Sequence, residues 1–286
     1  MSFSIKPLNC RLTFNLFQMR LKGFIQRNPV TSYYIGTFSI SWLGAFILVS
    51  PKLLSGQPIP KLDGILMFPV MLIGPVAASF TLTYILEGKP GIRSFVSRFS
   101  QWKAPLAWYI VAIGIPPCLI WLTLTILQTF VSSAYKPNFF LVGFLFGIPA
   151  GYLEEIGWTG FAYNKLRLKC SVLKSSLIVG LFWGLWHFPV IDFLGAATPH
   201  RQFLIPFFIA FITILVSMRL LMMWIYSKTG KLAIVQLMHM VSTGCLVTFG
   251  PFNITPGQET LWYGDYGIVL AITALLIYKF SEPKMI

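Results

Sequence analysis

Long apolar runs separated by short polar segments make up most of the chain. About eight runs are long enough to cross a bilayer as helices, which takes about 20 residues each. They lie near residues 31–50, 64–86, 105–131, 139–163, 173–191, 203–226, 231–251 and 266–280, and the last is short for a span. Because lipid offers no partner for backbone polar groups, the pattern predicts an all-α fold, a polytopic membrane bundle of about eight transmembrane helices.

The first 30 residues follow a different pattern. Apolar residues such as Phe14 and Phe24 alternate with basic ones such as Arg11 and Arg20, which also interrupt any signal-peptide core. We therefore expect a basic amphipathic N-terminal segment, followed by a transmembrane helical domain over residues 31–286. The segment either lies in the membrane interface or is a floppy basic tail, and the pattern favours neither.

Composition agrees with a membrane location. Hydrophobic residues make up 56% of the chain and charged residues 10%, with a mean hydropathy of +0.74. A soluble domain carries about 25% charged residues, so a water-soluble globule and a disordered chain are excluded. The net charge of +14 could suggest nucleic acid. We expect no nucleic-acid partner, because basic loops are also typical of the cytoplasmic face of a bilayer protein.

Charge also predicts the orientation. With eight spans, 17 of the 22 Lys and Arg residues fall in the termini and loops on one side, and only 4 fall on the other side. Positive loops stay on the cytoplasmic side during insertion. We therefore expect both termini of this multi-pass integral membrane protein to be cytoplasmic. As its location we expect a prokaryotic plasma membrane.

Two adjacent carboxylates, Glu154 and Glu155, lie within the fourth apolar run. Small residues recur every four positions ahead of them, at Gly143, Gly147 and Gly151, and such stripes let another helix approach closely. We therefore expect both carboxylates to point into the bundle. Two adjacent buried carboxylates cannot both ionise cheaply, and such a pair suits a general acid or base. The alternative is a pair that only hydrogen-bonds neighbouring helices.

Two histidines, His187 in the fifth run and His239 in the seventh, lie at a similar depth. Measured along the helices, Glu154, His187 and His239 lie about 12 to 20 Å from the first lysine at the basic end. This agreement in depth predicts that the three side chains share one site near the middle of the membrane. Each histidine alone could equally be a packed core residue or interhelical glue.

These residues, in this order, resemble three motifs of the CPBP family, the CAAX-protease and bacteriocin-processing group that is also called Abi. EExxxR is represented by EEIGWTGF, FxxxH by FWGLWHFP with Trp183 where Phe is usual, and HxxxN or HxxxD by HMVST. The stretch 88–109 is also similar to the family. The resemblance implies an intramembrane endopeptidase that cleaves a membrane-associated protein or peptide, of CAAX type or bacteriocin type, and it leaves open whether that substrate is prenylated.

The resemblance also implies roles for these residues. Glu154 and His187 would activate water, and His239 with Thr243 would lie near the oxyanion. Two residues depart from the motifs: Thr159 replaces the Arg, and Thr243 replaces the Asn or Asp. Thr243 can still donate a hydrogen bond, although more weakly than an amide.

Two mechanisms and two other functions remain open at this level. Glu154 paired with His187 can deprotonate water directly, or Glu154, His187 and His239 can bind Zn²⁺ as three ligands of a catalytic site. Glu and His at midplane also suit a proton-coupled transporter, although the chain shows no repeated halves. A catalytically silent binding, immunity or regulatory protein of the membrane is the other alternative.

Arg219 in the sixth run lies about as deep as Glu155, at about 13 Å and 15 Å from the nearest lysine along the helix. An unpaired Arg at this depth would cost about 2.5 kcal/mol or more. We predict that Arg219 replaces the missing motif Arg and pairs with Glu155, which leaves Glu154 free to act as the base. The alternative is an Arg whose long stem reaches the headgroups.

Overall fold

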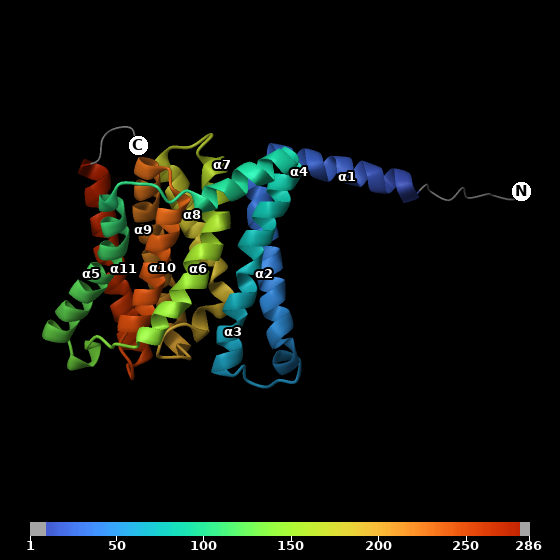
Figure 1. Cartoon of the computed structure of the whole chain (residues 1–286). Coiled ribbons are helices and arrows are strands. Elements are labelled where there is room, and N and C mark those ends of the chain that lie inside the picture. Colours follow the sequence, from blue (N-terminus) through green and yellow to red (C-terminus); the bar gives the residue numbers. More distant parts are fainter. Residues whose placement is uncertain (1–9, 281–286) are drawn as a thin grey trace, which may run out of the picture.

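The computed structural model describes residues 10–280, with side chains from residue 18 onward, and every regular element in this range is a helix (Figure 1). The α-helices are α1 (Cys10–Arg27), α2 (Pro29–Leu54), α3 (Lys61–Met71), α4 (Ile73–Ser97), α5 (Leu106–Phe130), α6 (Phe144–Gly157), α7 (Asn164–Leu166), α8 (Val172–Trp186), α9 (Leu204–Thr229), α10 (Leu232–Phe249) and α11 (Pro256–Phe280). Short 3₁₀ helices are η1 (Arg98–Ser100), η2 (Ser133–Tyr135), η3 (Leu141–Gly143), η5 (Phe188–Phe193) and η6 (Arg201–Phe203), and η4 (Trp158–Tyr163) is a π-helix.

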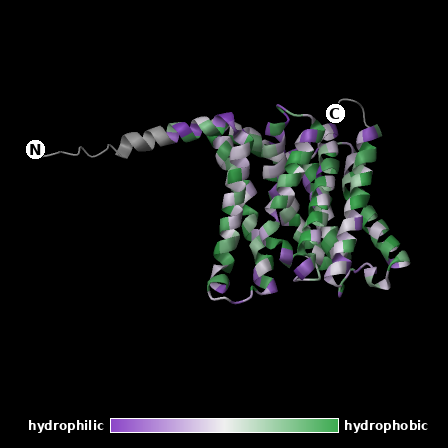
Figure 2. Cartoon of the chain, turned by 180° about the vertical axis from the view of Figure 1, so that it is seen from behind, coloured by the Kyte–Doolittle hydropathy of each residue, from purple (hydrophilic) through white to green (hydrophobic). Residues whose placement is uncertain are grey.

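The expected all-helical membrane bundle is confirmed. In the part of the chain that the structure describes, six helical segments are long and apolar enough to cross a membrane. They are α2, α3 with α4, α5, α9, α10 and α11. The two other expected spans, near 139–163 and 173–191, are built from shorter helices. The first corresponds to α6, η4 and α7 in succession, and the second corresponds to α8 followed by η5. Figure 2 shows hydrophobic residues along the helices and hydrophilic ones at their ends.

Two expected spans have different boundaries in the structure. The run 64–86 is two helices that meet at Leu72, with Pro69 in the last turn of α3. Pro75, in the first turn of α4, lacks the N–H that would bond to the Met71 carbonyl in a continuous helix, so the helix is interrupted there. Ser41 donates its hydroxyl to that carbonyl instead. Helix α11 begins at Pro256 rather than near 266, because its first turns are polar and escape a hydropathy pattern.

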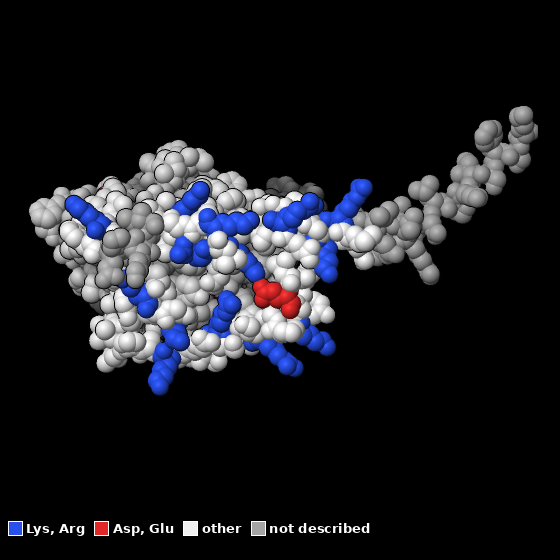
Figure 3. Space-filling view, turned by 90° about the horizontal axis from the view of Figure 1, so that it is seen from above, with Lys and Arg blue, Asp and Glu red and all other residues white. Residues whose placement is uncertain are grey.

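The basic end of the bundle contains α1, the end of α11 and the α9–α10 turn (Figure 1). Figure 3 views this end and shows Lys and Arg spread over it. Helix α1 runs away from the bundle at the same level, roughly across the direction of the spans. The first nine residues of the expected N-terminal segment lie outside the described residues, and its place in the interface stays a prediction.

Glycines make the contact between α6 and α10 close. A Cβ at Gly147 would overlap the Met240 carbonyl oxygen and would lie 2.7 Å from the Gly244 nitrogen. At Gly184, on α8, a Cβ would lie 2.9 Å from Ile212 of α9. The predicted small-residue stripes therefore lie at helix contacts, where they let the backbones of two helices approach closely. This packing sets the positions of the polar groups that follow on α6 and α8.

We predict that Gly147→Ala destabilises the fold, because its methyl group would push α10 away, and overpacking of this kind costs about 1–3 kcal/mol. The matched control is Gly114→Ala on α5, where a Cβ meets nothing within 4 Å. Thermal unfolding of both variants in detergent checks this. Equal midpoints for the two variants would contradict the close helix contact.

The orientation is tested at the opposite end of the bundle, in the segment before α11. This segment contains Asn253, and residues 251–265 carry no Lys or Arg. We predict that Asn253→Cys, in a chain whose four native cysteines are replaced, is labelled by an impermeant maleimide from outside the cell. A second cysteine at Lys228 should be labelled only in inverted vesicles. The reverse pattern would mean that the termini are outside.

Candidate active site

Helix α6 carries both glutamates into the centre of the bundle. Glu154 and Glu155 are fully buried, at 0% exposure. They follow the last glycine of the stripe by about one turn, so the close approach of α10 encloses them. The helix then widens into the π-helix η4, where backbone hydrogen bonding changes register. Charged groups are costly at this depth, so the partners of each carboxylate decide its state.

Glu155 uses both oxygens in direct interactions. Arg219, on α9, donates two hydrogen bonds to it, from Nη1 to Oε2 at 2.6 Å and from Nη2 to Oε1 at 3.0 Å. The Nδ1 atom of His239, on α10, lies 2.8 Å from Oε1. The hydroxyl of Thr159, one turn along from Glu155, donates to Oε2. Three helices therefore meet at one carboxylate.

The predicted pairing of Arg219 with Glu155 is present, and Arg219 is fully buried rather than extended to the headgroups. Thr159 belongs to the same network, since Nη1 of Arg219 lies 3.1 Å from its hydroxyl. A forked guanidinium matches a carboxylate in two places, which adds geometric specificity to the charge. Removing one partner of such a buried pair typically costs about 3–5 kcal/mol.

Glu154 has a different environment from its neighbour. Its Oε2 accepts a hydrogen bond from the indole N–H of Trp183, on α8, at 2.5 Å. Its Oε1 is buried and has no hydrogen-bond partner among the described residues. A buried acceptor without a partner is rare in folded proteins and calls for an explanation such as a catalytic role or a bound water. Glu154 is thus the carboxylate with a free oxygen.

Trp183 connects the expected site residues, and sequence reasoning did not assign it this role. Its indole contacts His187 and His239, with ring centroids at 6.1 and 4.9 Å. The guanidinium of Arg219 lies 4.2 Å from its ring centre, a distance typical of a cation–π interaction. The available signal was a Trp at the position of the motif Phe, which adds an N–H donor to an aromatic ring.

His187 lies beside this group without a hydrogen bond to either glutamate in the described part of the chain. Its Nδ1 is 2.8 Å from the carbonyl oxygen of Trp183. A carbonyl only accepts, so Nδ1 carries the proton and Nε2 of the neutral ring is an acceptor. The rings of Trp186, Phe211 and Phe68 surround the imidazole. The histidine is therefore oriented by its own helix and by aromatic packing.

Thr243 and the zinc alternative stay predictions. Thr243 is half-buried, and its side chain has no hydrogen bond in the described structure. Among the described residues, no three His, Cys, Asp or Glu side chains converge closely enough to hold a metal ion. As they lie here, the side chains of Glu154, His187 and His239 do not form a three-ligand zinc site, because they do not converge on one point. The bonds of His239 Nδ1 and Glu154 Oε2 leave the other nitrogen and the other oxygen available.

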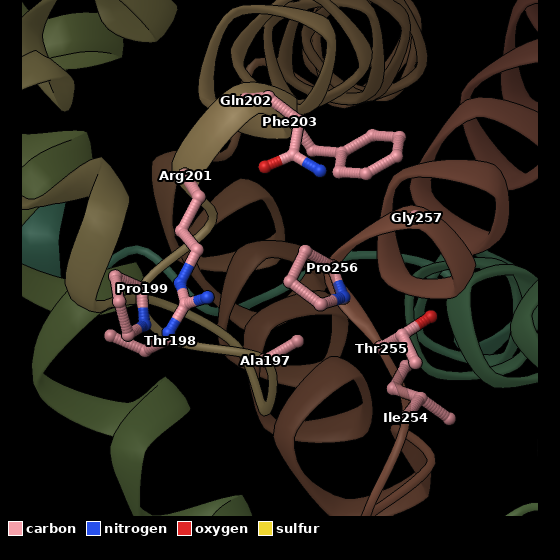
Figure 4. Close-up of a pocket in the computed structure, with 10 residues that line it drawn as sticks. All are labelled: Ala197, Thr198, Pro199, Arg201, Gln202, Phe203, Ile254, Thr255, Pro256 and Gly257. Atoms are coloured by element: carbon pink, nitrogen blue, oxygen red, sulfur yellow. The ribbon is translucent and has the colours of Figure 1, made fainter.

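A second polar cluster lies at the opposite end of the bundle and was also missed. His200 is fully buried between Asp192, with Nδ1 to Oδ1 at 3.0 Å, and Glu259, with Nε2 to Oε2 at 3.3 Å. Glu259 also accepts the backbone N–H groups of Ala196 and Ala197. The cluster ties the α8–α9 connection to the start of α11. The cavity next to it, shown in Figure 4, has a volume of about 450 Å³. Its lining residues are distant in sequence from Glu154 and Glu155.

The fold and the buried centre define the protein as a multi-pass helical membrane protein with a Glu–Glu–His–His group inside the bundle. Residues 136–245 match the family model described as type II CAAX prenyl endopeptidase Rce1-like. The chain is also 29% identical over 178 residues to the CAAX prenyl protease 2 of Methanococcus maripaludis. That match covers 56% of this chain and 61% of the relative's length. The resemblance to the CPBP proteases is therefore confirmed for the part of the chain that carries the motifs.

We predict that Arg219→Gln and Glu155→Gln each lower the free energy of unfolding by about 3–5 kcal/mol, because each leaves one buried charge unpaired. The double variant should be little worse than either single variant, since the interaction is lost only once. Thermal unfolding in detergent measures all three. Lys228→Gln, an exposed position on the same helix, is the control and should change little. Fully additive losses would contradict the pair.

Proposed function

We propose that this protein is an intramembrane endopeptidase that cleaves a membrane-associated protein or peptide, with a prenylated CAAX-type C-terminus as the favoured substrate. The observation that carries the proposal is Glu154, a buried carboxylate with one free oxygen, inside the segment that matches the prenyl endopeptidase family. The prenyl specificity is taken from the names of the family and of the relative. The residues of the centre support the peptidase chemistry.

Glu154 is the proposed general base. Its free Oε1 takes a proton from a water molecule, whose oxygen attacks the carbon of the scissile peptide bond. The carboxylic acid that results then gives this proton to the departing amine as the C–N bond breaks. The second proton of the water passes from the new carboxyl group to the amine, so the products are a carboxylate and an ammonium group, and Glu154 returns to its starting carboxylate state. The indole N–H of Trp183 holds the other oxygen, so the free oxygen keeps one direction throughout.

His187 and His239 take different roles in this proposal. With Nδ1–H donated to the carbonyl of Trp183, His187 offers Nε2 as an acceptor that orients the attacking water. His239, when protonated, donates Nδ1–H to Glu155 and keeps Nε2–H for the oxyanion of the tetrahedral intermediate. Glu155 is ionised in its pair with Arg219, so it stabilises the positive imidazolium. The second glutamate therefore supports the histidine rather than the water.

The proposed partners follow from the membrane location. The bilayer holds the enzyme and the lipid-modified end of its substrate in the same layer, and a prenyl chain adds about 0.8 kcal/mol per buried CH₂ to membrane affinity. We propose the plasma membrane of a prokaryote, with the basic end in the cytoplasm. Zinc held by Glu154, His187 and His239 remains an alternative that would require these side chains to move together.

We predict that Glu154→Gln lowers the cleavage rate by about 10² to 10⁴-fold, because the amide cannot take a proton from water. The test uses purified protein in lipid nanodiscs and a quenched fluorescent peptide with a prenylated cysteine near its end. The control is Asp63→Asn, which removes a carboxylate from the first turn of α3, at the end of the bundle away from the basic end, and which should retain the rate. Both variants should unfold at temperatures close to that of the parent protein.

Two outcomes would count against this proposal. Unchanged cleavage by Glu154→Gln would remove Glu154 as the base. No cleavage of any prenylated or unmodified peptide by the parent protein would favour the silent binding protein or the proton-coupled transporter instead. Metal analysis of the purified protein, together with the rate after chelation, decides whether zinc takes part.

A further inference from the structure

A polar pocket of about 320 Å³ opens at the basic end of the bundle. Helix α4, η1, the stretch from η4 to α7 and the end of α9 surround it. The lining residues that carry polar side chains are Thr83, Glu87, Arg98, Asn164, Lys165 and Tyr226. None of them takes part in the water chemistry proposed above. The pocket nevertheless shares the helical stretch of residues 144–166 with the two buried glutamates.

The charges in this pocket leave one cation without a carboxylate. Lys165 pairs with Glu87 at 2.6 Å, so these two charges balance. Arg98 makes only one long bond, from Nη1 to the backbone carbonyl of Gly160 at 3.4 Å. No described acidic side chain pairs with it. The pocket therefore carries a net positive charge, and a guanidinium with most of its donors unused matches a carboxylate in geometry.

The wall of the pocket is held in place by side chains. Asn164 donates its amide to the carbonyl oxygens of Thr159 at 2.9 Å and Gly160 at 3.2 Å. Tyr226, from α9, lies 3.2 Å from the same amide. These bonds occupy carbonyl groups of the π-helix, where the regular pattern is interrupted. Thr159 also donates its hydroxyl to Glu155, so a single residue links the wall to the buried ion pair.

The distance between this pocket and Glu154 suits a short peptide end. Gly160 is six residues beyond Glu154 on the same helical stretch, which is about 9 Å along the axis. A C-terminal CAAX motif places its free carboxylate three residues after the prenylated cysteine. Three extended residues span about 10 Å. Cleavage next to that cysteine, with the scissile bond at Glu154, therefore brings the carboxylate to the level of this pocket.

We propose that this pocket binds the free C-terminal carboxylate of the substrate and that Arg98 is its ion-pair partner. The inference rests on the proposed function, because it assumes a substrate whose cleaved bond lies a few residues from the chain end. Binding here would fix how far the substrate reaches past Glu154. It would also select chain ends over internal peptide bonds, since an internal segment has no carboxylate to offer.

The test compares two prenylated peptides of one sequence, one with a free C-terminal carboxylate and one with a C-terminal amide. Binding is measured to Glu154→Gln in nanodiscs, where cleavage does not interfere. We expect the acid to bind about tenfold more tightly than the amide, the size of one charge-assisted hydrogen bond. Adding Arg98→Gln should weaken binding of the acid alone and bring the ratio close to one.

Two further variants serve as controls for charge and position. Arg93→Gln removes an exposed cation from the end of α4, five residues before Arg98, without touching the pocket, and it should leave the ratio unchanged. Glu87→Gln frees Lys165 and removes a negative charge from the mouth, so it should raise the preference for the acid. Arg98→Gln and Glu87→Gln should thus change the acid-to-amide ratio in opposite directions, and loss of folding would not produce opposite effects.

The outcomes separate this inference from the proposed function. Equal binding of acid and amide, or an Arg98→Gln variant that weakens both equally, overturns the carboxylate pocket even if the parent protein cleaves peptides. A clear preference for the acid that depends on Arg98 supports the pocket even if the parent protein cleaves neither peptide. In that second case the endopeptidase proposal fails and a binding function at the same site takes its place.

Discussion

The buried ion pair of Glu155 with Arg219 is the interaction on which the centre of this protein depends. Both side chains are fully buried in a bundle whose surroundings are apolar, so neither charge has water to stabilise it. Each must therefore be satisfied by protein atoms, and the structure does so from α6, α9 and α10 at once. The Thr159 hydroxyl and the Trp183 indole complete the shell around the two charges. The crossing of these helices is consequently specified by charge as well as by packing.

The same pair explains why two adjacent glutamates differ in character. Glu155 is saturated by Arg219 and His239, and its charge is shared among cationic and polar neighbours. Glu154 points to α8 instead, where one indole N–H is its only described partner and one oxygen stays free. Consecutive residues on a helix differ by about 100° in direction, so they face different neighbours. One carboxylate can thus be structural while the next remains available for chemistry.

Close packing and polar bonding are coupled along α6. Gly147 and Gly151 let α10 approach, and this approach brings His239 within reach of Glu155. Beyond the glutamates the helix widens, and its carbonyl groups are taken up by Asn164 and Arg98 at the basic end. One helical stretch therefore supplies the helix contact, the buried charges and the wall of the pocket in turn. A change in the packing of this stretch would therefore alter the helix contact, the buried charges and the pocket wall together.

Much of this arrangement could be predicted from the chain itself. Hydropathy predicts the spans because a bilayer admits little else than apolar helices, and glycine spacing predicts which faces are buried. The motifs indicate Glu154, Glu155, His187 and His239 as the polar centre, and matched depth indicates Arg219 as a partner for Glu155. These inferences all use distance along a helix, which the order of residues determines directly.

Tertiary structure alone decided the remaining features. The rotation of α9 places Arg219 on Glu155, and the rotation of α8 turns the Trp183 N–H towards Glu154. The start of α11 and the burial of His200 depend on the connection between α8 and α9, which packs against the first turn of α11. The physical reason is common to all of these cases. Residue spacing determines depth and face within one helix, whereas the rotation of one helix against another is set by the packing of the whole bundle.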